Sequence, residues 1–286
     1  MTRLALLLLR ALHWLPLAVL RGAGAALGAL LYLVARERRM VATTNLALCF
    51  PDMDTACRAA LVRATFRAFC QSVIDRAILW HSPAARIRAL VRLDGIEHLR
   101  KAAGQPVILL APHFVGLDAA WARLTIEQRM VSMYARQKNA AFNQALKAGR
   151  TRFNAPVLVS RQDGVRAVLR ELSNGLPLYY LPDMDFGPRE TVFTPFFGVP
   201  AATVTAVSRL ARLANAAVLP VVTRMTPNGY DVTIHPPWEH YPGASDEADA
   251  RRMNAFIEAE VRSSLAQYHW LHKRFKTRPP GEARFY

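Results

Sequence analysis

The stretch Val107-Ile-Leu-Leu-Ala-Pro-His113-Phe-Val-Gly-Leu-Asp118 joins a short apolar run to two polar side chains that can carry chemistry. Residues 107–111 are wholly apolar, which predicts a buried β-strand, and residues 117–128 predict the helix that follows it. In open α/β sheets, ligands bind at the carboxyl ends of the strands. The sequence therefore predicts His113 at a position where a functional site is expected.

Strands and helices alternate on the carboxyl side of this stretch. Strands are predicted at 131–135, 156–160 and 176–181, and helices at 140–152, 165–173, about 204–214 and 246–267. A long loop rich in Pro, Gly and Phe follows residue 181, and a Pro-Asn-Gly turn joins a strand pair at 218–224 and 230–235. This order predicts an α/β fold with a mostly parallel sheet flanked by helices, in one catalytic domain over residues 39–286.

The amino-terminal part of the chain is strongly apolar. Residues 4–35 carry only Arg10, His13 and Arg21 as groups that can be charged near neutral pH. That length is sufficient to cross a bilayer, so residues 1–38 are predicted to be an N-terminal membrane helix that Pro16 kinks. On a continuous helix Arg3, Arg10 and Arg21 would form one stripe. A stripe also suits a helix lying in the membrane interface or packed against its own globular domain, and a buried core helix is the remaining alternative.

Charge restricts the classes of partner. Lys and Arg number 37 against 21 Asp and Glu, a formal net charge of +16, which favours a nucleic acid, an acidic protein or a phosphate-bearing membrane surface. Arg36, Arg38 and Arg39 follow the apolar segment, and the positive-inside rule places them on the cytoplasmic side. Residues 55–80 predict a further helix, with Arg76 near the edge of its apolar face.

His113 and Asp118 are the predicted catalytic pair. The five-residue spacing lets the carboxylate of Asp118 fold back on the imidazole, fix its tautomer and stabilise the imidazolium of a general base. The sequence has no Ser in a G-x-S-x-G turn, so the base would act directly on a substrate hydroxyl. Taken alone, the H-x4-D spacing is weak, and a structural histidine at the end of a strand explains it equally well.

Several further motifs accompany this pair. They are Asn45-Leu46, Cys49-Phe50-Pro51, Tyr134-Ala-Arg136, Asp183-Met-Asp185-Phe-Gly187, Val192-Phe-Thr-Pro-Phe-Phe-Gly198, Ala202-Thr203 and Trp270-Leu-His-Lys-Arg-Phe-Lys-Thr-Arg-Pro279. With them, residues 39–279 resemble the bacterial late lipid A acyltransferases, the lauroyl/myristoyl transferase family, within the wider H-x4-D glycerolipid acyltransferases. The long loop and the C-terminal string make the resemblance specific.

The resemblance implies a glycerolipid-acyltransferase-like domain and an activity. A fatty acyl chain would pass from acyl carrier protein to a hydroxyl of a lipid A precursor, at the cytoplasmic face of the bacterial inner membrane. Acyl carrier protein is acidic and lipid A precursors carry phosphates, so both partners suit a basic chain. A thioester donor requires no metal and no redox cofactor, because its thiolate already leaves readily.

Other candidate substrate-binding residues follow predicted strands. Arg136 would hold a phosphate or steady the oxyanion, unless it is simply a solvated surface residue. Asp183 and Asp185 could bind a metal–nucleotide or cap a loop; the resemblance favours a structural or acceptor-positioning role, with pairing to Arg136 or Arg189. Phe193, Phe196 and Phe197 of the long loop are predicted to pack in the core or to line an acyl groove. The basic run 272–278 is predicted to be a solvated helix end or a site for lipid phosphates.

Three other readings remain open at this point. The same chemistry could act on another glycolipid or on a phospholipid. An inactive, basic membrane-binding homologue is a second alternative, although an intact His113 and Asp118 disfavour it. Nucleic-acid binding is a third, which the lack of a recognisable module and the apolar N-terminus disfavour.

Overall fold

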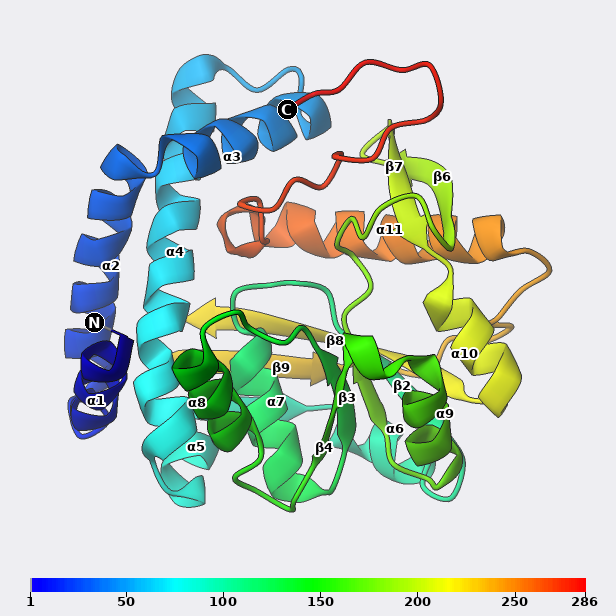
Figure 1. The fold of residues 1–286 in the computed structure, drawn as a ribbon, viewed down its shortest axis with the longest axis horizontal. Helices are drawn as coiled ribbons and strands as arrows, with labels where there is room; N and C mark the ends of the chain where they lie inside the picture. The colour runs from blue at the N-terminus through cyan, green and yellow to red at the C-terminus, as the bar shows by residue number, and fades with distance from the viewer. Residues whose placement is uncertain (1) are drawn as a thin grey trace.

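The computed structural model describes residues 2–286 and has a seven-stranded sheet at its centre (Figure 1). The strand order is β1-β9-β8-β2-β5-β3-β4, and all neighbours are parallel except β8 and β9. The strands of this sheet are β1 Val91–Asp94, β2 Val107–Leu110, β3 Val131–Tyr134, β4 Val157–Ser160, β5 Leu178–Tyr180, β8 Ala217–Thr226 and β9 Gly229–Ile234. The predicted α/β class and the mostly parallel sheet are confirmed.

Helices cover both faces of the sheet (Figure 1). They are α5 Ala84–Leu90, α6 Ile96–Lys101, α7 Leu117–Glu127, α8 Ala140–Arg150, α9 Val165–Ser173, α10 Ala206–Ala214 and α11 Asp246–Ser263, with the 3-10 turns η1 Arg161–Asp163 and η2 Leu265–Gln267. Two buried hydrophobic clusters fill the space between sheet and helices. The elements predicted from residue 107 onward lay on apolar runs or stripes, and their bounds agree with the structure to within a few residues.

The loop after β5 contains a hairpin that the sequence did not predict. Strands β6 Thr191–Phe196 and β7 Val199–Val204 pair in antiparallel fashion and form a separate two-stranded sheet. Phe197 and Gly198 form the turn with φ of 51° and 79°, the backbone of a two-residue hairpin turn with both residues left-handed. Two prolines within these strands suppressed the strand signal, since proline cannot donate to a ladder.

The predicted helix of residues 1–38 is not continuous, whereas the helix predicted over residues 55–80 is present as α4; residues 2–81 form four helices in all. They are α1 Thr2–Leu12, α2 Leu17–Val34, α3 Arg36–Cys49 and α4 Thr55–His81. Pro16 lies at the N-cap of α2, so the predicted kink is a complete break. Helices α2 and α4 lie side by side (Figure 1), and a Cβ added at Gly24 or Gly28 would come within 2.6–2.7 Å of the α4 backbone. The glycines therefore permit the close approach of the two helices.

A buried ion pair joins α2 to the rest of the protein. Arg21 Nε lies 3.1 Å from Asp75 Oδ2, and Arg21 Nη2 donates to the carbonyl of Gly229 at 2.9 Å. The hydroxyl of Tyr230 donates to the same Asp75 oxygen at 2.6 Å. Burial raises the pKa of Asp75, although the charge of Arg21 opposes this. The predicted arginine stripe is therefore wrong: Arg21 points into the protein, because the break at Pro16 separates it from the arginines of α1.

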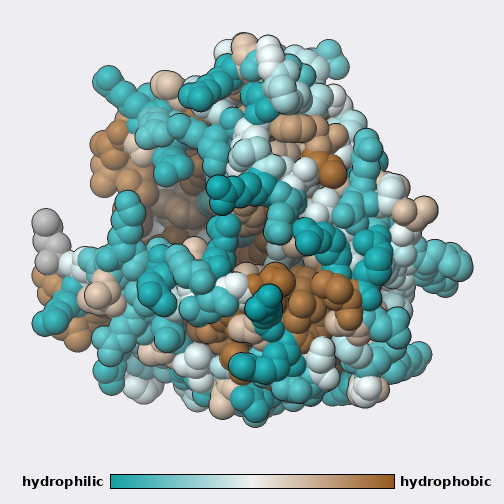
Figure 2. All heavy atoms as spheres, turned by 45° about the vertical axis from the view of Figure 1, so that its right-hand side comes forward, coloured by the Kyte–Doolittle hydropathy of each residue, from teal (hydrophilic) through white to brown (hydrophobic). Residues whose placement is uncertain are grey.

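Exposed hydrophobic side chains concentrate at the N-terminus. Most of the large ones in residues 2–286 lie on α1, the following turn and the outer face of α2: Leu4, Leu7, Leu8, Trp14, Leu15, Val19, Leu30, Leu33 and Val34. Figure 2 shows hydrophobic surface at its left edge, where α1 lies. Within the described residues α2 is the one helix long and apolar enough to cross a bilayer. It carries both a packed face and a bare apolar face.

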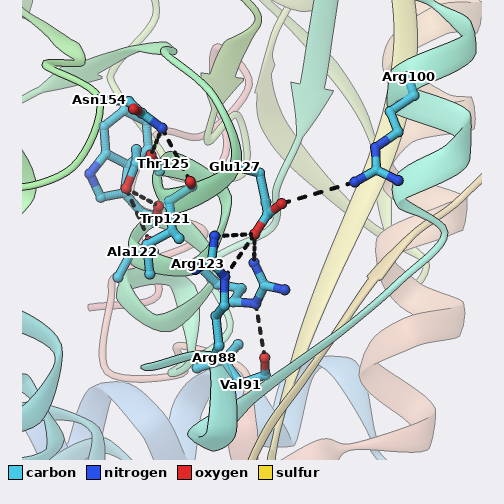
Figure 3. A network of polar contacts seen from close by, with 10 residues as sticks. Arg88, Val91, Arg100, Trp121, Ala122, Arg123, Thr125, Glu127 and Asn154 are labelled. Carbon is cyan, nitrogen blue, oxygen red and sulfur yellow. Dashed lines mark hydrogen bonds and ion pairs between the residues drawn. The ribbon is translucent and has the colours of Figure 1, made fainter. Parts of the chain in front are cut away.

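The end of α7 is fixed by a group of charged side chains around Glu127 (Figure 3). Glu127 accepts from Arg88 at 3.2 Å and from Arg123, whose Nε donates to the carbonyl of Val91 at 3.2 Å. Asn154 caps the last turn by donating to the carbonyls of Thr125 and Ile126. These contacts hold α7, whose first turn carries Asp118, against α5 and β1.

Candidate active site

Two adjacent parallel strands bring His113 and Asp183 together. Leu110 of β2 is paired with Tyr180 of β5, and the backbone bond from Ala111 N–H to the Tyr180 carbonyl extends the pairing. His113 and Asp183 each come three residues after their paired strand residue. The matched register therefore delivers both side chains to the same edge of the sheet.

Asp183 binds His113 with both carboxylate oxygens. Its Oδ1 lies 2.6 Å from His113 Nδ1, and its Oδ2 accepts the backbone N–H of His113 at 2.9 Å. Burial opposes ionisation of Asp183, but its contacts with His113 prevail and lower its pKa to about 2. An ionised carboxylate can only accept, so Nδ1 carries the proton and Nε2 is left as the basic ring nitrogen.

Asp118 was predicted to contact the imidazole of His113, but its partners are two arginines. Its Oδ1 accepts from Nε and Nη2 of Arg150 at 2.9 and 2.6 Å, and its Oδ2 accepts from Nε of Arg76 at 2.7 Å. Burial alone would raise the pKa of Asp118; the charges of Arg150 and Arg76 outweigh it and hold the pKa at about 2. The expected contact of Asp118 with the imidazole is thus corrected, because both oxygens are taken by arginines from α8 and α4.

The C-terminal segment holds the histidine loop in place. Val115 N–H donates to the carbonyl of Gln267 at 2.8 Å, and His269 N–H donates to the carbonyl of His113 at 3.0 Å. Asn45 of α3, which is fully buried, donates to the carbonyls of Trp270 and His272 at 2.7 and 2.8 Å. These bonds explain why motifs at opposite ends of the chain accompany the His113 stretch.

Two further histidines lie close to His113. The ring of His269 lies 6.3 Å from that of His113, centroid to centroid. Burial lowers the pKa of His269 to about 3 and that of His272 to about 4, and the ring of His113, when it is protonated, acts in the same direction. Both rings are therefore neutral at physiological pH and place no additional charge beside His113.

A cavity of about 1040 Å³ opens in front of these groups. His113, Asp118, Arg76 and Arg150 line it together with many apolar side chains. The apolar part of the lining comprises Phe69, Phe114, Val115, Leu117, Trp121, Met133, Ala135, Leu158, Val165, Leu181, Met184, Phe186, Val204 and Ala206. Figure 2 shows hydrophobic surface within a hollow whose rim is hydrophilic. The cavity can therefore take a long apolar chain while its wall also presents basic groups.

Of the other candidate residues, Asp185 is buried and is bound by the C-terminal segment. It accepts from the N–H and hydroxyl of Thr277 at 2.6 and 2.7 Å, and from the N–H of Gly187 at 2.9 Å. The pairing of Asp183 and Asp185 with Arg136 or Arg189 is thus wrong, since His113 and Thr277 occupy them. Arg189 is exposed and lines the cavity, whereas Arg136 is exposed just beyond β3, at the predicted sheet end.

Two of the three phenylalanines predicted in the long loop pack against other apolar side chains, and part of the basic run is buried. Phe196 is fully buried in the main core and Phe197 packs on Phe50, so the packing interpretation holds for both. The basic run is not a solvated helix end: Arg274 is buried and donates to the carbonyl of Ala202 at 2.9 Å. Lys276 is the member of the run that reaches the cavity, alongside His272.

Arg76 and Arg150 are functional candidates that the sequence did not single out. Arg76 was visible only as a basic residue near the edge of an apolar helix face, and Arg150 only as one of several basic residues near a helix end. Their convergence on Asp118 depends on how α4 and α8 cross α7. That information is tertiary and has no local sequence signal.

Comparison with known proteins places this site in context. Residues 1–277 match the family described as bacterial lipid A biosynthesis acyltransferase. The chain is 31% identical over 277 residues to the lipid A biosynthesis palmitoleoyltransferase of Escherichia coli K12, covering 95% of this chain and 90% of that protein. It is 32% identical over 272 residues to the lauroyltransferase of the same organism, covering 93% and 88%.

A solved structure shows a more distant likeness. The 1-acyl-sn-glycerophosphate acyltransferase PlsC from Thermotoga maritima superposes with a TM-score of 0.42 at 14% identity, covering 82% of this chain and 98% of that one. That similarity is too low to add to the comparison by sequence.

Proposed function

This chain belongs to the bacterial lipid A biosynthesis acyltransferase family, and we propose that it transfers a fatty acyl chain from acyl carrier protein to a hydroxyl of a lipid A precursor. The observation that carries the proposal is the His113–Asp183 pair at the wall of a large, mostly apolar cavity. The reaction is acyl transfer from a thioester to an alcohol, with His113 as general base.

The chemistry follows from the free Nε2 of His113. Nε2 removes the proton of the acceptor hydroxyl, and the resulting oxygen nucleophile attacks the thioester carbonyl. Asp183 stabilises the imidazolium that forms, because its carboxylate already accepts from Nδ1. Collapse of the tetrahedral intermediate breaks the carbon–sulfur bond, and the imidazolium returns its proton to the departing thiolate. The products are an ester and a free thiol.

The cavity supports both substrates of this reaction. Its apolar lining suits a fatty chain, and the basic residues around it suit an acidic carrier protein and a phosphorylated acceptor. Arg189 lines the cavity and is proposed to contact substrate directly. Arg136, exposed beyond β3, is proposed to contact an outer part of a substrate. Asp185 would act indirectly, by fixing the loop that carries Asp183.

Membrane association is proposed to occur through α1 and the bare face of α2. Their exposed leucines and Trp14 form the apolar surface, and Arg36, Arg38 and Arg39 follow it directly. Apolar area and adjacent basic residues together favour binding to an anionic bilayer. By the positive-inside rule the catalytic domain would lie on the cytoplasmic face of the inner membrane.

The decisive test uses purified protein with acyl carrier protein thioesters and a lipid A precursor. We expect His113→Ala to lower kcat/KM by about 10²- to 10⁴-fold with an unchanged melting temperature, since that is the contribution of a positioned base. His98→Ala on α6, outside the cavity lining, is the matched control and should behave as wild type. Wild-type turnover by His113→Ala would refute the assignment of the base.

A genetic experiment defines the acceptor. Mass spectrometry of lipid A from a strain lacking the gene should show one secondary acyl chain missing, and its mass gives the chain length. Unaltered lipid A together with an altered phospholipid profile would redirect the activity to a different acceptor.

A further inference from the structure

Two arginines share one carboxylate at the wall of the cavity. Arg76 from α4 and Arg150 from α8 both bind Asp118, at 2.7 and 2.6 Å for their shortest contacts. The side chain of Asp118 is only 6% exposed, whereas those of Arg76 and Arg150 are 23% and 18% exposed. The group therefore carries one uncompensated positive charge, and its arginines are the part that reaches the open space.

The arginines retain unused hydrogen-bond donors. Within residues 2–286, Arg76 hydrogen-bonds to protein only through Nε, and the side chain of Arg150 only through Nε and Nη2. Both terminal nitrogens of Arg76 and Nη1 of Arg150 remain available, and both residues line the cavity that His113 also lines. A guanidinium fork with free terminal nitrogens matches the geometry of a phosphate group.

The remaining charges at the cavity favour an anion as well. Arg161, Arg189 and Lys276 line the same space. Of the acidic residues that line it, Asp185 is occupied by Thr277, and Glu190 lies 3.4 Å from Arg209. A single arginine would suffice to neutralise Asp118. The second brings two like charges together, an arrangement whose cost a bound anion offsets.

We propose that Arg76 and Arg150, oriented by Asp118, form a binding site for a phosphate group of one substrate. The inference rests on the proposed function, because that reaction supplies two phosphate-bearing molecules. One source is a phosphate on the sugar of the lipid acceptor. The other is the phosphodiester in the prosthetic arm of the carrier protein. Either would place a charged anchor in the same cavity as His113, with the reacting group beside the base.

The experiment removes the phosphate and the arginines separately. Steady-state kinetics are measured for wild type, Arg76→Gln, Arg150→Gln and the surface control Arg170→Gln on α9. One arm compares the acceptor with its dephosphorylated form. The other compares the carrier thioester with an acyl-pantetheine thioester that lacks the phosphate. Arg150→Lys is measured alongside Arg150→Gln. If Arg150→Gln does not fold, Arg150→Lys still tests the site.

The proposal predicts an effect confined to one arm. Each glutamine variant should raise KM about 10- to 100-fold for the phosphate-bearing substrate, the size expected for a lost hydrogen bond to a charged group. On the substrate that lacks the phosphate, the KM of wild type should rise by the same factor, and the KM of each variant should rise little further. Arg150→Lys should recover only part of the loss. The arm that responds identifies the source of the phosphate.

Other results would overturn the site. Equal losses with and without phosphate in both arms would show that the arginines act only structurally, as would a fall in kcat with KM unchanged. A readout independent of turnover is the melting temperature in inorganic pyrophosphate, which should rise in wild type and not in Arg76→Gln. Wild type that is inactive with every acceptor would refute the proposed function, whereas equal pyrophosphate stabilisation of both proteins would refute only this site.

Discussion

Asp118 and Asp183 are both buried and both have a pKa of about 2, but opposite kinds of neighbour produce this value. Asp183 is bound to the imidazole of His113, whereas Asp118 is bound to the guanidinium groups of two arginines. Asp118 lies five residues from His113 in sequence, and Asp183 lies 70 residues away. A low pKa of a buried carboxylate therefore indicates a strong interaction with a neighbouring group, and the identity of that group determines what the carboxylate can do.

Asp183 and Asp118 should differ most in how their substitution affects the chemical step. Asp183→Asn places an amide where the imidazole needs an acceptor, so we expect kcat to fall about 10²- to 10³-fold, within the range of general-base effects. In the double variant with His113→Ala, Asp183→Asn should add almost nothing, because the two residues act as a unit. Multiplicative losses in this kinetic cycle would show that Asp183 acts elsewhere.

Asp118→Asn should act on binding more than on chemistry. The asparagine oxygen can accept from one arginine but carries no charge, so Arg76 and Arg150 lose their common anchor. We expect KM for the phosphate-bearing substrate to rise about 10-fold and kcat to change by less, since one charge-assisted hydrogen bond is at stake. If kcat falls as far as in Asp183→Asn while KM stays constant, the contrast between the two carboxylates is lost.

The same substitution should change how stability depends on pH. The folded pKa of Asp118 is lowered from 3.8 to about 2, so its ionised form contributes on the order of 2 kcal/mol above pH 4. This contribution is lost as the pH falls from about 4 towards 2. In chemical denaturation, the gap in unfolding free energy between wild type and Asp118→Asn should be constant from pH 7 to 5 and narrow below pH 4. A gap independent of pH down to 3 would contradict the assignment of charge.

The smallest effect is expected at Arg136. It is exposed and lies outside the cavity lining, so Arg136→Ala should lower kcat/KM only a few-fold, and Arg136→Lys should restore most of that loss. Rates for both variants, with melting temperatures as the control, measure this. A loss as large as that of Arg150→Gln, not recovered by Lys, would assign a bidentate contact to Arg136 and move the anion site towards β3.

The sequence predicted the components of this site better than their pairing. His113 and Asp183 were each recognised after a strand, because apolar runs such as residues 107–111 mark buried strands directly. Their contact required knowing that β2 and β5 are neighbours, which depends on packing of the whole sheet. The short strand β1 was not predicted, for a local reason. Its four residues, Val91–Asp94, alternate between apolar and charged side chains and contain no apolar run. The arginines on Asp118 were unpredictable for the same tertiary reason.

Asp75 and Arg76 are consecutive residues of α4, and they serve different neighbours. Successive helix positions point about 100° apart, so Asp75 binds Arg21 of α2 while Arg76 binds Asp118 at the cavity. The hydrophobic N-terminus is consequently not a detachable tail. A shortened enzyme made for easier purification would leave the buried carboxylate of Asp75 without its cation, next to a residue of the cavity wall. Lost activity in such a protein would report damage to α4 as much as separation from lipid, and an anchor borrowed from another protein would need its own arginine at this point.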